Sequence, residues 1–201
     1  MIPSKIPATL SRYETKLLFS HIDPNFKSAA LLLYGSEIRR SQCLRLRVND
    51  VDLSQLQIRV WCNVELKHKF MAISPALLPC LKRQIDRVKS YLLEDLSMQQ
   101  SPHYFLTSRL EKKYKKANLE LGWHYLFPSN LNVIEPSLDD EVKRHHIGER
   151  PFNLAIANAV RKAGISKQIS SQTLRHSFSA LLQNSADVQY INAHLAPSGV
   201  A

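Results

Sequence analysis

The stretch "LLLYGSEIRRSQCLRLRVNDVDL", from Leu31 to Leu53, changes from an apolar run to a basic one within a few residues. Its apolar part is typical of a buried helix, and Gly35 is a residue type that commonly ends one. The basic part crowds arginines around the start of a further short helix: Arg39, Arg40, Arg45 and Arg47. A guanidinium group is a planar, bidentate donor that suits phosphate oxygens, so this cluster predicts an anion-binding site beside the core.

Capping residues and apolar spacing predict that the chain around this stretch is mainly helical. Helices are expected at about residues 11–21, 24–34, 38–46, 75–96, 151–165, 171–185 and 187–195. Alternating residues predict two strands, Leu56–Cys62 and Lys67–Ile73, joined by a turn at residues 63–66. Residues 97–149 show no regular pattern and are expected to form an irregular insertion. The predicted fold class is α+β, mainly α, with a small antiparallel β-hairpin or sheet.

The composition favours a polyanion as partner. The 201 residues carry 27 Lys and Arg against 17 Asp and Glu, a formal net charge of +10. Nucleic acid is the first candidate and an anionic membrane surface the second, while a merely basic soluble protein is the remaining alternative. No signal peptide is expected, because the first residues, MIPSKIPATL, lack a continuous apolar run, and the longest apolar run, Ala29–Tyr34, is too short to span a bilayer.

The cysteines predict a reducing compartment. Cys43, Cys62 and Cys80 are odd in number and form no CxxC pair, which argues against a disulfide framework and against a zinc knuckle. Cys43 lies in an apolar helical stretch and is expected in the core.

Arg39 and Arg175 each lie near the start of a predicted short helix, where free N–H groups and the helix dipole favour an anion. Together they could hold one phosphate from two sides and stabilise the added charge of a pentavalent transition state. The alternative from spacing alone is that each makes a surface salt bridge.

Three segments resemble the tyrosine recombinases, a family of DNA strand-transfer enzymes. "YGSEIRRSQCLRLRVNDVDL" (residues 34–53) resembles the first signature box and "SSQTLRHSFSALL" (residues 170–182) the second. "GWHYLFPSNLNVIEPSLDDEVKRHH" (residues 122–146) is similar to the insertion of the integron integrases, and the likeness runs from about residue 8 to 195. The resemblance implies that Arg39 and Arg175 are the two catalytic arginines and that other arginines of the first box face the DNA backbone.

The same resemblance implies that catalysis is impaired. The hairpin lysine that protonates the leaving oxygen aligns with Val64, for which Lys67 is a possible substitute. Gln172 replaces the histidine of the second box and cannot titrate near neutral pH. Further departures are Gln42 in place of the acidic residue of box one, Ala196-Pro197 in place of Gly-His, and Tyr190 as the last tyrosine, too early to be the nucleophile. The expectation is a catalytic domain over residues 8–201 that is C-terminally truncated and lacks the family's N-terminal core-binding domain.

The insertion is expected to contact DNA. By resemblance it would hold bases flipped out of a folded single strand, which need an aromatic platform and polar groups for their edges. The residues expected there are Trp123, Pro136, Arg144, His145 and His146, together with Lys112, Lys113, Lys115 and Lys116 of the basic run 109–116. The alternatives are that Trp123 is a core residue, that the basic run is a solvated helix face, and that the histidine pair is solvated or binds zinc.

The functional hypothesis is a DNA-binding site-specific recombinase, similar to integron integrases, whose cleavage is impaired. The alternatives are a non-catalytic DNA-binding or regulatory module and a gene remnant that folds poorly. Partners would be DNA, including a folded single-stranded site, and full-length integrase protomers, without a membrane. No cofactor or metal is implied, because phosphoryl transfer through a protein tyrosine uses neither. The expected location is the bacterial cytoplasm, on the nucleoid.

Overall fold

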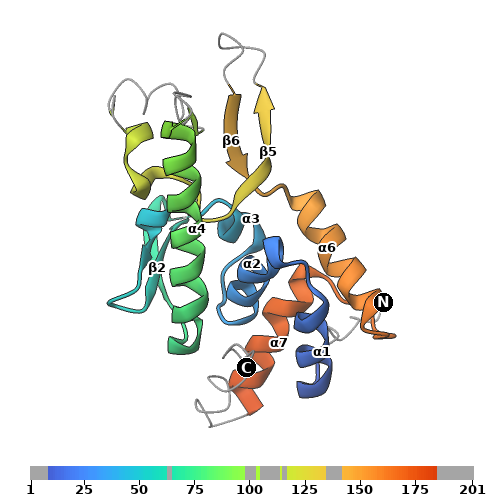
Figure 1. Ribbon diagram of the computed structural model, residues 1–201. Coiled ribbons are helices and arrows are strands. Elements are labelled where there is room, and N and C mark those ends of the chain that lie inside the picture. The colour runs from blue at the N-terminus through green and yellow to red at the C-terminus, as the bar shows by residue number, and fades with distance from the viewer. Residues whose placement is uncertain are drawn as a thin grey trace.

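The computed structural model describes residues 9–62, 65–97, 103–104, 114, 117–134 and 142–184. Figure 1 shows a helical body with a small sheet at one side and a two-stranded projection, β5 and β6, that extends away from the helices. The predicted fold class is therefore confirmed as mainly helical with antiparallel β-structure.

The first two helices begin at the predicted caps. Helix α1 (Arg12–His21) starts with a capping box in which Ser11 and Glu14 each accept a hydrogen bond from the other's backbone N–H. Helix α2 (Pro24–Tyr34) is capped by the Asp23 side chain and has proline at its first position. Its residues from 29 to 34 are all buried, so this apolar run lies at the centre of the core.

The basic stretch leads from a short helix into the first sheet. Helix α3 (Arg40–Leu44) is shorter than the predicted helix over 38–46, and the one-turn 3₁₀ helix η1 (Val48–Asp50) follows it. Strands β1 (Val51–Asp52), β2 (Gln57–Cys62) and β3 (Lys67–Ala72) pair antiparallel in the order β1-β2-β3. The predicted hairpin is thus confirmed, with β1 as an additional edge strand.

The longest predicted helix is also present. The 3₁₀ turn η2 (Pro75–Leu77), capped by Ser74, leads into α4 (Leu78–Ser97), which buries one face. On that face the Gln84 side chain donates a 2.8 Å hydrogen bond to the Leu126 carbonyl oxygen, which links α4 to the insertion. The buried carbonyl group is therefore paired, as burial requires.

The expectation of an irregular insertion is wrong for part of residues 97–149. Strands β4 (His103–Tyr104), β6 (Val142–His146) and β5 (Pro128–Ile134) form a second sheet in the order β4-β6-β5. The 3₁₀ turns η3 (Ala117–Leu119) and η4 (Leu121–Trp123) precede β5. These strands escape detection because the pairing of β5 with β6 is broken by an irregularity, and because β4 pairs parallel with a strand far along the chain.

The C-terminal helices close the core. Helix α6 (Glu149–Lys162) packs near α1, and α7 (Ser171–Asn184) packs against α2, which brings the two ends of the described chain together (Figure 1). Side chains with almost no exposure join the two halves: Leu32, Leu33, Ile38, Leu44, Phe127, Phe152 and Leu174. The helix expected over 187–195, with Tyr190, lies outside the described residues, as do Ala196 and Pro197.

Two of the three cysteines are core residues. Cys43 and Cys80 are buried, Cys62 is half-buried, and all three are free thiols. Burial raises the pKa of the Cys43 thiol far above its ordinary value, so this group stays protonated. Within the described part of the chain, no helix combines the length and the apolar character that crossing a membrane demands.

Candidate phosphate-binding site

Arg39 stands at the position that precedes the first turn of α3. Its backbone N–H donates to Gln42 Oε1 at 3.3 Å, and Gln42 Nε2 donates to the Trp61 carbonyl oxygen at 3.1 Å. Gln42, the residue expected to be acidic by resemblance, therefore ties the start of α3 to the end of β2 through one neutral side chain. This link fixes the backbone of Arg39 relative to the end of β2.

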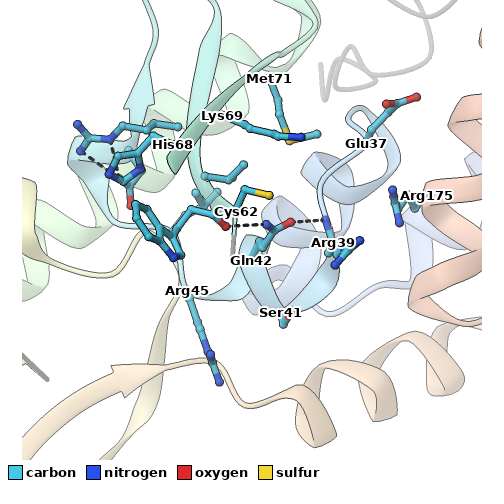
Figure 2. Close-up of a pocket in the computed structure, with 15 residues that line it drawn as sticks. Glu37, Arg39, Ser41, Gln42, Arg45, Cys62, His68, Lys69, Met71 and Arg175 are labelled. Atoms are coloured by element: carbon cyan, nitrogen blue, oxygen red, sulfur yellow. Dashed lines mark hydrogen bonds and ion pairs between the residues drawn. The ribbon is translucent and has the colours of Figure 1, made fainter. Parts of the chain in front are cut away.

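Arg175, near the other end of the sequence, lies beside Arg39 in the folded chain. It lies on the first half of α7, and it lines two adjoining cavities of about 510 and 240 Å³ together with Arg39 and Ser41. Figure 2 shows the Arg39 and Arg175 side chains side by side, one from the loop before α3 and one from α7. The structure thus places both arginines on one cavity system, a geometry suited to gripping a phosphodiester from two sides.

Arg40, the next residue after Arg39, lines the smaller cavity and also joins α3 to two other helices. Its guanidinium group forms an ion pair with Glu149 of α6 and donates to Ser171 Oγ, the first residue of α7, at 3.1 Å. A longer hydrogen bond of 3.3 Å reaches Asn153 Oδ1. One side chain therefore fixes α3 against both helices and positions α7, which carries Arg175.

Lys69 is the lysine of the larger cavity, and the sequence interpretation missed it. Its ammonium group pairs with Glu65, whose hydrogen bond and charge raise the pKa of Lys69. Lys67, the substitute suggested from sequence, pairs with Glu65 at 2.9 Å, is 65% exposed and does not line the cavity. Strand alternation puts Lys67 and Lys69 on the same face of β3, so it could have added Lys69 as a second candidate but could not have chosen between them.

Gln172 lies on the smaller cavity beside Arg39 and Arg175. Its side chain is exposed, and its Nε2 atom lies 3.2 Å from Nε2 of His176, one helical turn further along α7. A carboxamide in this place can donate to a phosphate oxygen, but it cannot act as an acid or a base. Val64, aligned with the hairpin lysine, lies outside the described residues.

The remaining arginines of the opening stretch separate into two roles. Arg45 lines the larger cavity, and Figure 2 shows its side chain pointing away from Arg39 and Arg175. Arg47 instead turns to the insertion: it donates to the Trp123 carbonyl oxygen and covers the Tyr125 ring, 4.7 Å from its centroid. Arg40 and Arg47 thus bind neighbouring elements, although Arg40 also lines the smaller cavity, and the expectation that the remaining arginines face the DNA backbone stays a prediction.

The insertion gathers aromatic rings at the base of β5 and β6. The Tyr125 ring lies 5.5 Å from His145 and 5.1 Å from His146, and the two histidine rings are 4.2 Å apart. Trp123 is half-buried and packs 4.9 Å from Tyr114. Burial is the main cause that lowers the pKa of His146, while it raises the pKa of Tyr125.

Other insertion residues are engaged internally or lie outside the described residues. Arg144 pairs with Asp95 of α4 at 3.0 Å and covers the Tyr91 ring at 4.5 Å, so it joins β6 to α4. Pro136, Lys112, Lys113, Lys115 and Lys116 lie outside the described residues. Among those that are described, no group of three His, Cys, Asp or Glu side chains is arranged to hold a metal ion.

This chain resembles known proteins over nearly its whole length. The model of the Phage integrase family matches residues 9–198. Two proteins named "Integrase/recombinase", from Escherichia coli and from Pseudomonas aeruginosa, are each 31% identical over 198 residues, which is 98% of this chain and 58% of each relative. The tyrosine recombinase XerA of Thermococcus kodakarensis is 26% identical over 204 residues, covering all of this chain and 57% of XerA.

Two solved structures share the fold. A crystal structure of XerA recombinase superimposes with a TM-score of 0.61 at 22% identity, covering 98% of this chain and 59% of that one. The site-specific recombinase XerH, bound to its difH substrate in a pre-cleavage complex, gives 0.56 at 16% identity, covering 97% and 48%. The chain thus spans between about half and three fifths of the length of these relatives.

Proposed function

Because the chain belongs to the phage integrase family of site-specific tyrosine recombinases, we propose that it binds DNA by gripping a backbone phosphate between Arg39 and Arg175. The single observation that supports this most is the position of both arginine side chains on the same two cavities, although they are 136 positions apart in the sequence. The net charge of +10 adds the general attraction that phosphate binding needs. Residues 8–201 would act as one catalytic-type domain.

Alanine substitution of each arginine tests whether Arg39 and Arg175 bind the DNA phosphate. In fluorescence anisotropy with labelled DNA, Arg39→Ala and Arg175→Ala should each weaken binding by about 1–3 kcal/mol, the range of a charged hydrogen bond that is lost. Arg161→Ala is the matched control, because Arg161 is exposed at the far end of α6, where it donates a hydrogen bond to Asn158 of its own helix. Losses no larger than that of the control would refute a shared phosphate site.

We also propose that cleavage is impaired. Gln172 stands where the family resemblance implies a histidine and Val64 where it implies a lysine, so proton transfer to the leaving oxygen lacks both groups. A nicked suicide substrate traps the covalent protein–DNA intermediate of a recombinase that cleaves, and denaturing electrophoresis detects it. We expect no adduct from the native sequence. A clear adduct would overturn the impairment and leave the DNA-binding proposal standing.

The insertion supports a third element of the proposal, an integron-type preference for folded single-stranded sites. Tyr125, His145 and His146 form a compact ring cluster at the base of β5 and β6, and Trp123 lies close by along the chain. Such rings can receive extrahelical bases. Binding to a hairpin with unpaired bases should exceed binding to the matching perfect duplex. Equal and steeply salt-dependent binding to both would leave only nonspecific attraction.

A second candidate function is favoured by Gln172: a non-catalytic module that occupies recombination sites. Such a module would act on the nucleoid, either alone or beside full-length integrase protomers. Added to a recombination assay driven by an active relative, the native chain should lower product yield, and Arg175→Ala should not. Unchanged yield with the native chain, at concentrations that saturate the site, would exclude this function.

A further inference from the structure

We propose that the outer face of the β2–β3 ribbon is a stacking surface for unpaired bases of single-stranded DNA. The residues of this stacking face are Arg59, Trp61, His68 and Phe70. The inference rests on the proposed function, because it needs a DNA backbone held at Arg39 and Arg175. It goes beyond that function by assigning a separate base-binding site outside the insertion.

The strand register places these side chains on one face. Trp61 pairs with His68 and Arg59 pairs with Phe70 across the two strands, and alternate residues of a strand share a face. The Trp61 and His68 rings touch edge to face, with centroids 5.1 Å apart. On β2, the intervening residues Ile58 and Val60 are buried, so the opposite face of this strand is the one that meets the core.

The aromatic side chains of this face are open to solvent. Trp61 is 48% exposed and Phe70 is 63% exposed. Large aromatic rings on an open sheet face cost free energy unless a partner covers them, so such a patch indicates a binding surface. Stacking on aromatic rings of a sheet is a general way of holding single-stranded nucleic acid, because every base has a π-face.

The positive charge near the aromatic rings favours DNA as the ligand of this face. Arg59 is held on the face by Asp50, with its Nε and Nη2 atoms 3.3 and 3.2 Å from Oδ1, so its guanidinium group is oriented rather than free to rotate. Trp61, His68 and Arg59 line the same cavity as Arg39, Arg45 and Arg175. That cavity also takes in Val60, Lys69 and Met71 of the opposite face, so it reaches around the edge of the ribbon. A strand whose phosphate sits between the two arginines can therefore pass this edge, beside Lys69, to the rings.

A second copy of this chain is the competing occupant, and the charge argues against it. Two copies joined by this face would bring together their cavities, each lined by Arg39, Arg45 and Arg175; Arg59 adds little to that charge, because Asp50 pairs with it. Repulsion between the two positively charged cavities would oppose that contact, whereas the same positive charge attracts a polyanion. Continuity with the phosphate cavity likewise favours DNA.

Tryptophan fluorescence provides a direct test, because the chain contains two tryptophans. In the variant Trp123→Phe, Trp61 is the remaining fluorophore. A gapped duplex with unpaired bases beside the nick should quench its emission, as stacked bases do, and the same duplex without the gap should quench it much less. Quenching that is equal for both substrates, or absent although anisotropy shows binding, would overturn the stacking face.

Affinity measurements separate this inference from the proposed function. Trp61→Ala and Phe70→Ala should each weaken binding to the gapped substrate about five- to tenfold, in line with the loss of one stacked base, and leave duplex binding within about twofold. Arg175→Ala should weaken binding to both substrates. Tyr13→Ala is the matched control, since Tyr13 is a 75% exposed aromatic residue on α1.

The remaining outcomes of these binding experiments distinguish failure of the stacking face from failure of the proposed function. If Arg175→Ala weakens both substrates and the aromatic variants weaken neither, the stacking face is wrong and the phosphate grip stands. If the native chain binds neither substrate, the proposed function fails. If Trp61→Ala changes the sedimentation coefficient of the free protein, the face joins two copies and the DNA assignment is overturned. Circular dichroism checks that each variant is folded. If Trp61→Ala is unfolded, Phe70→Ala replaces it in these experiments.

Discussion

The role of Arg40 as the connection between α3, α6 and α7 can be tested by Arg40→Gln. This change removes the ion pair with Glu149 and the 3.1 Å hydrogen bond to Ser171 Oγ, while it keeps a polar side chain of moderate length. Helix α7 would then be held less firmly at its first turn. Because Arg175 follows one turn later on α7, phosphate binding should weaken. Arg40 also lines the smaller cavity, so Glu149→Gln, which removes the ion pair and keeps the Arg40 charge, separates positioning of α7 from direct contact with DNA.

The magnitude follows from the exposure of the partners. The side chains of Arg40 and Glu149 are 35% and 41% exposed, so solvent screens their ion pair and it contributes at most about 1 kcal/mol. Ser171 is only 3% exposed, and leaving its hydroxyl group without this donor costs about 1 kcal/mol more. The free energy of unfolding should fall by about 1–2 kcal/mol, which for a domain of this size lowers the Tm by about 2–8 °C.

Thermal melting and DNA anisotropy measure the two consequences. Arg161→Gln removes the same charge from an exposed place on α6 and corrects for the general loss of attraction to DNA. A double-mutant cycle with Glu149→Gln isolates the pair, with an expected coupling of less than about 1 kcal/mol. If Arg40→Gln matches Arg161→Gln in both Tm and DNA affinity, Arg40 does not position α7 and the reasoning fails.

Three further predictions address the insertion and the cavity. Gly122→Ala should lower the free energy of unfolding by less than about 1 kcal/mol in urea titrations, although the new Cβ would lie 2.1 Å from Asn49 Oδ1, because the exposed Asn49 side chain can rotate away; a loss of several kcal/mol would contradict this packing. The pKa of His146 is lowered in the folded chain, so the folded state takes up its proton at lower pH than the unfolded state does. Thermal stability should therefore fall as pH drops below about 6.5, and His146→Asn should reduce that fall; an unchanged pH profile would speak against it. Lys69→Ala should weaken DNA binding more than Lys67→Ala, because Lys69 lines the cavity, and equal effects in anisotropy would count against that placement.

Local sequence patterns were sufficient where the controlling contacts lie within a few residues. Ser11 and Asp23 accept hydrogen bonds from backbone N–H groups of the helices that follow them, so both helix starts were predictable. The alternation of β2 was readable for the same reason. The second sheet was not, because β4 bonds to β6 across a long separation and its two residues carry no period of their own.

The sequence by itself determined the family likeness, the helical character and the identity of the two arginines that could hold a phosphate. Only the tertiary structure decided which basic side chains reach the cavity. Arg39 and Arg40 are neighbours, yet only Arg39 lines the larger cavity, whereas Arg40 lines the smaller one and is bound to Glu149 and Ser171. Lys67 and Lys69 likewise share a strand face and a carboxylate partner, but only Lys69 lines the larger cavity. The physical reason is that a side chain's direction follows from the local backbone, whereas its surroundings depend on helices brought together by burial of a common core.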